Sequence, residues 1–186
     1  MHFASLFVLS CAALSAALTP TQISNKFKKM ENISTRCINK AQKLEAKDGT
    51  NINSPSSRFQ DIFKDIDEID SLANEISASV EALPSQYSSS DSTTVMNGYS
   101  SWSSQHQEVY VNLNYARQPF AGMAPVCNAI RDSISKDQDS LDRLGNALLS
   151  KVATSDRYVV TRIRASLGRQ ASGVKRNYCE GINSGE

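Results

Sequence analysis

Glycine, proline and histidine are scarce in this sequence. Its 186 residues include only 8 Gly, 5 Pro and 2 His. So few helix-breaking residues favour long helices over a series of short strands and turns. Only His106 lies beyond residue 17, so any Ser-His or Cys-His catalytic centre in the rest of the chain has to be built on it. The sequence therefore offers little for catalysis.

The short motifs of metal, calcium and phosphate sites are also missing. Asp65, Asp67, Glu68 and Asp70 lack the glycine turn of a calcium loop, and we interpret them as part of a solvated helix face. There is no glycine-rich phosphate loop, and a net charge of +1 argues against nucleic-acid binding. We predict no catalytic residue, metal, cofactor or nucleic-acid partner.

Residues 3–17 form an uncharged apolar run that ends in small residues. This pattern is typical of a secretory signal peptide, with cleavage expected after Ala17, although an apolar helix buried in the core is an alternative. The run is too short to cross a bilayer as a helix. No hydrophobic tail follows Cys179, so we expect no membrane anchor. The prediction is a secreted protein, extracellular or in a cell wall, with one domain over residues 18–186.

Apolar residues recur at helical spacing in five long segments, separated by short polar or proline-containing stretches. Thr19-Pro20-Thr21-Gln22 supplies a cap, a first-turn proline and a capping-box glutamine for the first segment. The sequence therefore predicts an all-α fold, an up-down bundle of about five long amphipathic helices. The expected helices cover residues 20–47, 54–83, 95–116, 124–150 and 155–179.

Cys127 and Cys179 are equally distant from the polar turn expected near residue 153. Positions equidistant from the turn of an antiparallel helical hairpin lie side by side, so these cysteines should meet and form a disulfide. Loss of the leader removes Cys11 and leaves an odd number of cysteines, so one thiol stays unpaired or pairs elsewhere. Cys37 lies on the apolar stripe of the first helix, which favours a buried thiol over a reactive one.

Two features concern the surface. Asn32-Ile33-Ser34 is the only N-glycosylation sequon, and its use requires Asn32 to face solvent. Charge is also divided between helices, because residues 58–83 carry an excess of acids and residues 155–179 an excess of bases. The simpler interpretation is that helices of opposite sign are neighbours. The other is an anion-facing surface on the last helix, for a polysaccharide phosphate or a carboxylate head group.

The wide apolar faces leave two interpretations of the interior, a tightly packed core or a tunnel between the helices. The packed core is the simpler interpretation. Under it, His106, which lies on the apolar stripe of its helix, is a hydrogen-bonded core histidine. In a tunnel, a fatty acid would direct its carboxylate towards His106, Tyr99 or Arg131. Its tail would lie among apolar side chains from three helices: Phe59, Phe63, Ile66, Trp102, Ile130 and Ile134.

Three stretches after the leader carry a resemblance: Leu18-Thr19-Pro20-Thr21-Gln22-Ile23, Pro125-Val126-Cys127-Asn128-Ala129-Ile130-Arg131 and Tyr178-Cys179. With the leader, they resemble the fungal hydrophobic surface binding protein A and cell wall galactomannoprotein family. The resemblance implies a secreted, often glycosylated helical protein that coats hydrophobic surfaces or sits in the wall, and some relatives carry long-chain fatty acids. Cys37 and the arginine-rich last helix depart from the family pattern, and only Cys127 and Cys179 are carried over.

Together these observations predict a secreted, non-enzymatic fungal protein that binds hydrophobic surfaces or lipids, such as long-chain fatty acids. The alternative is a wall mannoprotein or secreted effector that engages a wall polysaccharide or a host protein through its charged helices. An enzyme with an unrecognised site around His106 is a third hypothesis.

Overall fold

The computed structural model describes residues 17–180, and within this range the chain is helical with no β-strand. The predicted signal peptide, apart from Ala17, lies outside the described residues. One-turn elements connect the long helices: α2 (Ala46–Thr50), η1 (Gln118–Phe120) and η2 (Thr154–Asp156). The five long helices are α1 (Pro20–Ala41), α3 (Arg58–Glu81), α4 (Ser89–Ala116), α5 (Ala124–Lys151) and α6 (Arg157–Tyr178).

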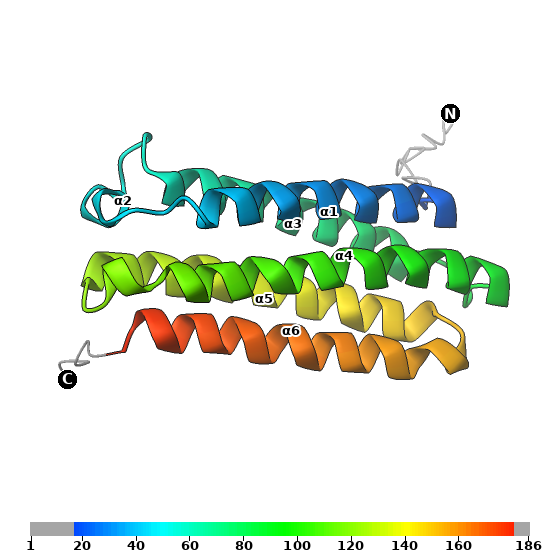
Figure 1. Cartoon of the computed structure of the whole chain (residues 1–186). Coiled ribbons are helices and arrows are strands. Elements are labelled where there is room, and N and C mark those ends of the chain that lie inside the picture. The colour runs from blue at the N-terminus through cyan, green and yellow to red at the C-terminus, as the bar shows by residue number, and fades with distance from the viewer. Residues whose placement is uncertain (1–16, 181–186) are drawn as a thin grey trace, which may run out of the picture.

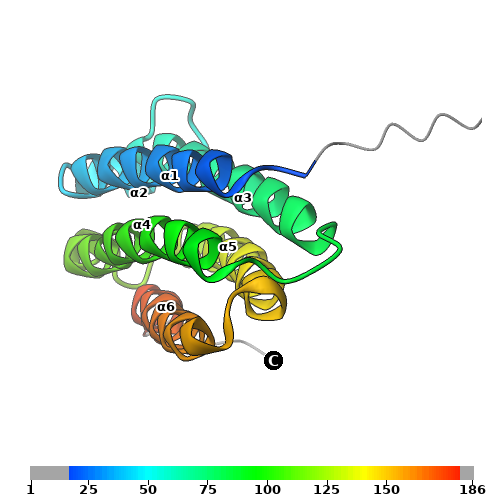
Figure 2. The same cartoon turned by 90° about the vertical axis from the view of Figure 1, so that its right-hand side faces the viewer.

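Successive long helices run in opposite directions along one common axis (Figure 1). Helix α1 packs against α3 and α4, α5 packs against α3 and α6, and α6 packs against α4. The five helices therefore close a ring. Seen end-on in Figure 2, α1 and α3 form one layer, α4 and α5 the next, and α6 lies below them. The predicted all-α up-down bundle is confirmed.

The first helix begins as predicted but ends earlier. Thr19 and Gln22 form the expected capping box at the start of α1. The helix stops at Ala41 instead of Lys47, and a separate short helix, α2, covers Ala46–Thr50. The reason is the buried carboxylate of Asp48. It accepts a hydrogen bond from the Glu45 backbone N–H at 2.9 Å and contacts Arg58 Nη1 at 3.0 Å, which ties α2 to the start of α3.

Serine side chains set the starts of the next two helices. Helix α3 begins at Arg58, later than the predicted Ser54, because the hydroxyl of Ser57 accepts the Phe59 N–H at 3.3 Å. Ser88 accepts the Asp91 N–H at 3.2 Å and starts α4 six residues before the predicted stripe. These caps are local, so α1, α3 and α4 each start where a side chain satisfies an otherwise unpaired N–H group, whereas α5 and α6 have no side-chain cap.

Aromatic side chains fill both halves of the bundle interior. Phe27 of α1 stacks on Trp102 of α4, with ring centres 5.8 Å apart. Phe59 of α3 meets Phe120 edge-on at 4.9 Å, near the end of the bundle that carries α2. Cys37 is free and buried, as predicted. In this conformation the interior is a packed core, which agrees with the simpler of the two interpretations of the sequence.

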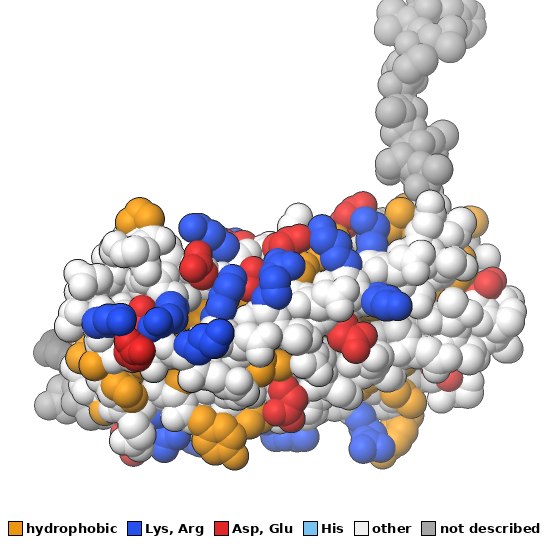
Figure 3. Space-filling model, turned by 45° about the horizontal axis from the view of Figure 1, so that its top comes forward, with side chains coloured by type: hydrophobic (Ala, Val, Ile, Leu, Met, Phe, Trp, Pro, Cys, Tyr) orange, Lys and Arg blue, Asp and Glu red, His pale blue; other side chains and the backbone are white. Residues whose placement is uncertain are grey.

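The predicted pairing of the acidic and basic helices is wrong. Helix α5 lies between α3 and α6, so these two do not form a packed pair. The acids of α3 instead meet bases of α1 and α5, as in Lys26–Glu75 at 2.7 Å and Arg143–Glu81 at 3.2 Å. Figure 3 shows blue and red side chains side by side on the face that α1 and α3 share. Helix α6 is left without its expected partner.

Candidate functional site

A buried polar cluster lies inside the ring. His106 Nε2 is 3.0 Å from Asp137 Oδ2, and the Tyr110 hydroxyl donates to the same oxygen at 2.5 Å. On the other side of the imidazole, Nδ1 lies 3.4 Å from Ser34 Oγ. All four side chains are buried. Helices α1, α4 and α5 therefore meet through polar groups in the middle of an otherwise apolar interior.

Asp70 of α3 completes this cluster. Burial is the main cause that raises the pKa of Asp70 to about 9. The negative charge of Asp137 and a hydrogen bond with Asp137 raise this pKa further. Burial alone would also raise the pKa of Asp137, but His106 and the hydrogen bonds from His106, Tyr110 and Asp70 lower it. The raised pKa of Asp70 and the lowered pKa of Asp137 favour a protonated Asp70 beside an ionised Asp137, and neither buried oxygen of Asp70 has another donor among the described residues.

The structure corrects the interpretation of the acidic helix and confirms that of His106. The acids of the second long helix do not all lie on a solvated face, because Asp70 is 2% exposed and Asp65 6% exposed. Asp65 is covered by Lys40, whose Nζ is 2.7 Å away, whereas Asp70 points into the ring. His106 is a hydrogen-bonded core residue, as the simpler interpretation held. The cluster also includes Tyr110 and Asp137, which the sequence analysis did not single out, and Ser34, which it named only as part of the glycosylation sequon.

The contacts within the cluster connect Ser34 to His106 and His106 to Asp137, as in a hydrolytic Ser-His-Asp triad. The geometry of these residues nevertheless does not fit one. The three side chains are 0% exposed, so a substrate cannot reach the Ser34 hydroxyl in this conformation. The His106 to Ser34 contact, at 3.4 Å, is long for a hydrogen bond. Within residues 17–180 there is also no group of three or more side chains placed to hold a metal ion. This arrangement fits structural pairing of buried polar groups.

The candidate tail-binding residues lie in the core. Phe59, Ile66, Trp102, Ile130 and Ile134 are buried, and Phe63 is half-buried beside Phe59, with ring centres 5.9 Å apart. The structure divides them into two groups. Trp102 packs with Tyr99 and Phe27. Phe59 packs with Phe120 and Tyr178 near the disulfide. The polar cluster lies between these groups along α4.

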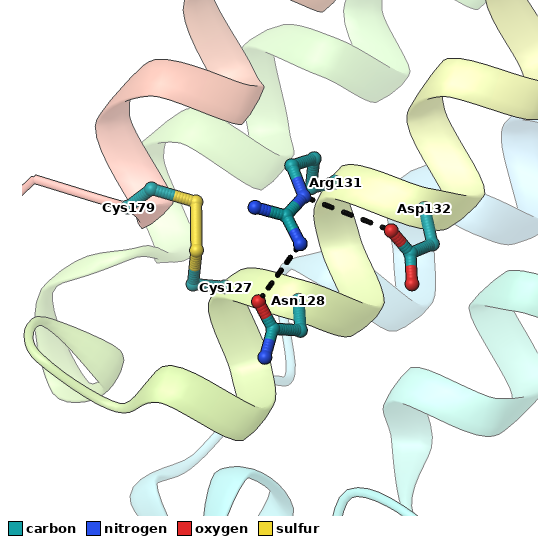
Figure 4. Close-up of a disulfide and its surroundings, with 5 residues drawn as sticks. All are labelled: Cys127, Asn128, Arg131, Asp132 and Cys179. Carbon is teal, nitrogen blue, oxygen red and sulfur yellow. Dashed lines mark hydrogen bonds and ion pairs between the residues drawn. A yellow bond between two sulfur atoms is a disulfide. The ribbon is translucent and has the colours of Figure 1, made fainter. Parts of the chain in front are cut away.

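Of the three candidate head-group residues, Arg131 stands apart. It is exposed, and its Nη2 donates to Asn128 Oδ1 at 3.1 Å while Nε lies 3.7 Å from Asp132 (Figure 4). Arg131 therefore points along the outer face of α5 instead of joining His106 and Tyr99 inside the ring. Asn32 is exposed on α1, whereas Ser34 of the same sequon is buried against His106.

Arg164 is a basic residue at the core that the sequence analysis treated only as part of the charged helix. It lies across α5 where Gly145 has no side chain, and a Cβ there would overlap Arg164 Cδ. Its Nη1 and Nη2 bind Asn146 and Asp142 at 2.8 and 3.0 Å, while the buried Nε has no partner among the described residues.

A cavity of about 10 Å³ lies beside Arg164 between α5 and α6, and its wall includes Tyr110, Gln138, Leu141 and Leu167. This volume is enough for about one water molecule. Tyr110 takes part in both features, because its ring lines the cavity and its hydroxyl donates to Asp137. Tyr110 therefore belongs both to the wall of this cavity and to the polar cluster.

No protein-family model matches the sequence, and no curated protein matches it. Two solved structures share the fold. Afmp4p in complex with palmitic acid superimposes with a TM-score of 0.73 and 14% identity, covering 86% of this chain and 99% of that one. Ligand-binding domain 2 of the Penicillium marneffei MP1 protein, complexed with arachidonic acids, gives 0.62 and 11%, covering 84% and 96%. At these identities the likeness establishes the fold.

Proposed function

We propose that this chain is a non-enzymatic binding protein that holds a long-chain fatty acid inside its ring of five helices. The observation that carries the proposal is the fold, which most of the chain shares with two fatty-acid complexes, those of Afmp4p with palmitic acid and of MP1 with arachidonic acids. The interior supports it, because apolar side chains from all five long helices line the ring.

The distribution of apolar surface favours an internal ligand over adsorption to an external hydrophobic surface. The only exposed large hydrophobic residues between 17 and 180 are Tyr115, Tyr158 and Val159. An acyl chain of palmitate length that moves from water into the core gains on the order of 10 kcal/mol, at about 0.8 kcal/mol for each buried CH₂ group. Part of this gain offsets the cost of separating the helices.

The ring is closed in this structure, so uptake requires one seam to open. The α4–α6 seam is the best candidate because polar side chains bridge it: Ser166 donates to Gln107 at 2.9 Å, and Asn177 donates to Asn114 at 3.0 Å. Water replaces such hydrogen bonds at little net cost. The Cys127–Cys179 disulfide keeps α6 attached to α5 while α6 moves away from α4.

The fatty-acid carboxylate should lie near Arg164 and not at the middle of the ring. Asp137 already carries a negative charge beside His106, and a second buried carboxylate there would be repelled. Arg131 is outside the ring. Arg164 offers a buried Nε–H without a partner at the edge of the apolar interior. Tyr99, the third candidate, is buried among the rings of Phe27 and Trp102.

The resemblance to the fungal hydrophobic surface binding protein A and galactomannoprotein family supports a setting for this activity. We place the protein outside the cell or in the wall, after cleavage near Ala17. The apolar run before Ala17 and a disulfide in the folded domain support this setting, because disulfides persist in oxidising compartments. Glycosylation at Asn32 belongs to the same proposal.

Native mass spectrometry with and without added palmitate tests the proposal. We expect a discrete mass increase of one or two acyl chains, and no increase with butyrate, which has the carboxylate without the long tail. Trp102, the only tryptophan, gives a second readout, because a chain among the core aromatic rings changes its emission. An unchanged mass and unchanged emission at saturating palmitate would reject the proposal.

A further inference from the structure

Most of the positive charge of helix α6 has no ion-pair partner among residues 17–180. Between Arg157 and Tyr178 there are six basic residues and no acidic one. Among the described residues only Arg164 of these six forms an ion pair, with Asp142. Helix α1 is different, because Lys26, Lys29, Arg36 and Lys40 all pair with acids of α3. Unpaired bases therefore gather on α6, whereas α1 has only Lys28 outside the described ion pairs.

Three of these bases form a straight row on the outer face. Arg162, Arg169 and Arg176 are exposed and lie seven residues apart. Seven residues make almost two full turns, so the three side chains share one face and are spaced by about 10.5 Å along the helix. We call them the α6 arginine row. The row extends along the edge of the bundle, where a flat anionic surface could contact all three at once.

The exposed apolar residues lie at one end of this row. Tyr158 is 69% exposed and Val159 39% exposed, and the Arg162 guanidinium carbon is 5.7 Å from the centre of the Tyr158 ring. An exposed aromatic ring beside arginines is the side-chain combination that favours the interface of a membrane, where the ring enters the head-group layer and the charges contact phosphates.

A groove without acidic residues runs beside the row. It has a volume of about 320 Å³ and lies between α4 and α6. Its lining contains hydroxyl and amide groups and one arginine but no acid: Ser100, Ser103, Ser104, Gln107, Arg162 and Ser166, with Val159 and Ile163. Hydroxyl donors beside a guanidinium suit a phosphate group. No carboxylate of the groove would repel it.

We propose that the α6 arginine row, with Tyr158 and the α4–α6 groove, is a docking surface for membranes that contain anionic phospholipids. The charge complementarity favours this partner, and the exposed Tyr158 favours a bilayer over a purely polar polyanion. The surface is separate from the fatty-acid site inside the ring. Docking would also place the polar α4–α6 seam against the bilayer, from which an acyl chain can transfer.

Vesicle flotation tests this surface. The purified protein should float with vesicles of phosphatidylcholine and phosphatidylserine, but not with phosphatidylcholine alone, and added salt should reduce binding. The triple variant Arg162→Gln, Arg169→Gln, Arg176→Gln should lose about a hundredfold in partitioning, since each base near an anionic surface contributes about fivefold. Tyr158→Ser should weaken binding by a smaller factor.

The matched control removes the same charge elsewhere. Lys28, Lys43 and Lys64 are exposed on other helices and loops, and their replacement by Gln should leave flotation within about twofold. Equal losses in both triple variants, or equal binding to both kinds of vesicle, would overturn the proposal, as would binding to a phosphorylated polysaccharide but not to vesicles. Palmitate binding, measured by native mass spectrometry in the arginine variant, should be unchanged, which separates this test from that of the fatty-acid site.

Discussion

Cys127 at the start of α5 and Cys179 at the end of α6 are 52 residues apart in sequence and have Cα atoms 4.9 Å apart. Their disulfide closes the open end of the hairpin that turns at Val152 and Ala153 (Figure 4). At the same end Tyr178 packs against Phe59 and donates its hydroxyl to the Leu113 carbonyl at 2.9 Å. The link therefore fixes the end of α6 against both α5 and the core.

Replacing either partner of the disulfide should destabilise the protein equally. On the chain-entropy model a loop of this length contributes about 4 kcal/mol. Cys127→Ser and Cys179→Ser should then each lower Tm by roughly 8–16 °C in a thermal scan. The control is Cys37→Ala, which removes a free buried thiol and should cost about 1 kcal/mol. Clearly unequal effects of the first two changes would contradict a purely structural disulfide.

The fold was predictable because its determinants are local. Helical spacing, the Thr19 capping box and the equal distances of Cys127 and Cys179 from the turn can each be read without knowing the partner helices. The order of helices around the ring was not predictable. Charge suggested that the acidic and basic helices are neighbours, but α3 found counter-charges on α1 and α5 instead. Which long amphipathic helices become neighbours depends on how all their apolar and polar faces pack together, and charge is only one contribution to that packing.

Stability should fall with rising pH because of Asp70. Its pKa is about 9 in the folded protein and about 3.9 in an unfolded chain, so between these values only the folded state holds the proton. The free energy of unfolding therefore decreases from about pH 4 to about pH 9. Asp70→Asn supplies a neutral donor to Asp137 at every pH. It should remove this slope and raise stability at pH 8 by about 1–2 kcal/mol, as measured by urea unfolding at several pH values.

The comparison residue for this change is Asp67. It lies on the same helix but is exposed and paired with Lys136 at 2.5 Å. Asp67→Asn should alter stability by less than about 1 kcal/mol and keep the pH slope of the parent protein. Lys136 and Asp67 also act on the Asp70 charge, so both single variants are measured over the same pH range. An Asp70→Asn protein with an unchanged slope would show that Asp70 is ionised in the fold.

The buried cluster was only partly accessible from sequence. Asp137 falls three residues after Ile134 and four before Leu141, which places a carboxylate on the apolar stripe of α5. This signal was available. The burial of Asp70 was not predictable, because Asp70 lies among acids that do face solvent. Its burial depends on α5 packing over it. The free Nε of Arg164 could not be inferred at all, since it depends on how α6 lies over Gly145.

Two glycines of the α5–α6 seam should respond to alanine in opposite directions. A Cβ at Gly168 meets only Gln138, at 3.9 Å, so Gly168→Ala should stabilise the helix by about 0.5–1 kcal/mol. A Cβ at Gly145 would displace Arg164 from Asp142 and Asn146, and Gly145→Ala should destabilise by about 1–3 kcal/mol. The double variant Gly145→Ala, Arg164→Ala should recover part of this loss in thermal unfolding. A stabilising Gly145→Ala would show that Arg164 moves aside freely.

Arg164 should affect the affinity for a fatty acid only by contacting the carboxylate of the ligand. If the head group binds at the free Nε, Arg164→Gln removes a charged hydrogen bond, a contribution of about 1.5–3 kcal/mol, and should weaken palmitate binding roughly 10- to 100-fold. Hexadecanol has the same chain length and no charge, so its affinity should change by less than about threefold, because the apolar walls are intact. Titration of Trp102 fluorescence gives both affinities in one assay. Arg169→Gln on the outer face is the control and should change neither affinity.

Two outcomes would contradict this assignment in different ways. If Arg164→Gln weakens both ligands equally, Arg164 acts by closing the seam over the tail and the carboxylate lies elsewhere. If neither ligand binds the parent protein, the failure lies with the fatty-acid proposal itself and not with the assignment of its head group.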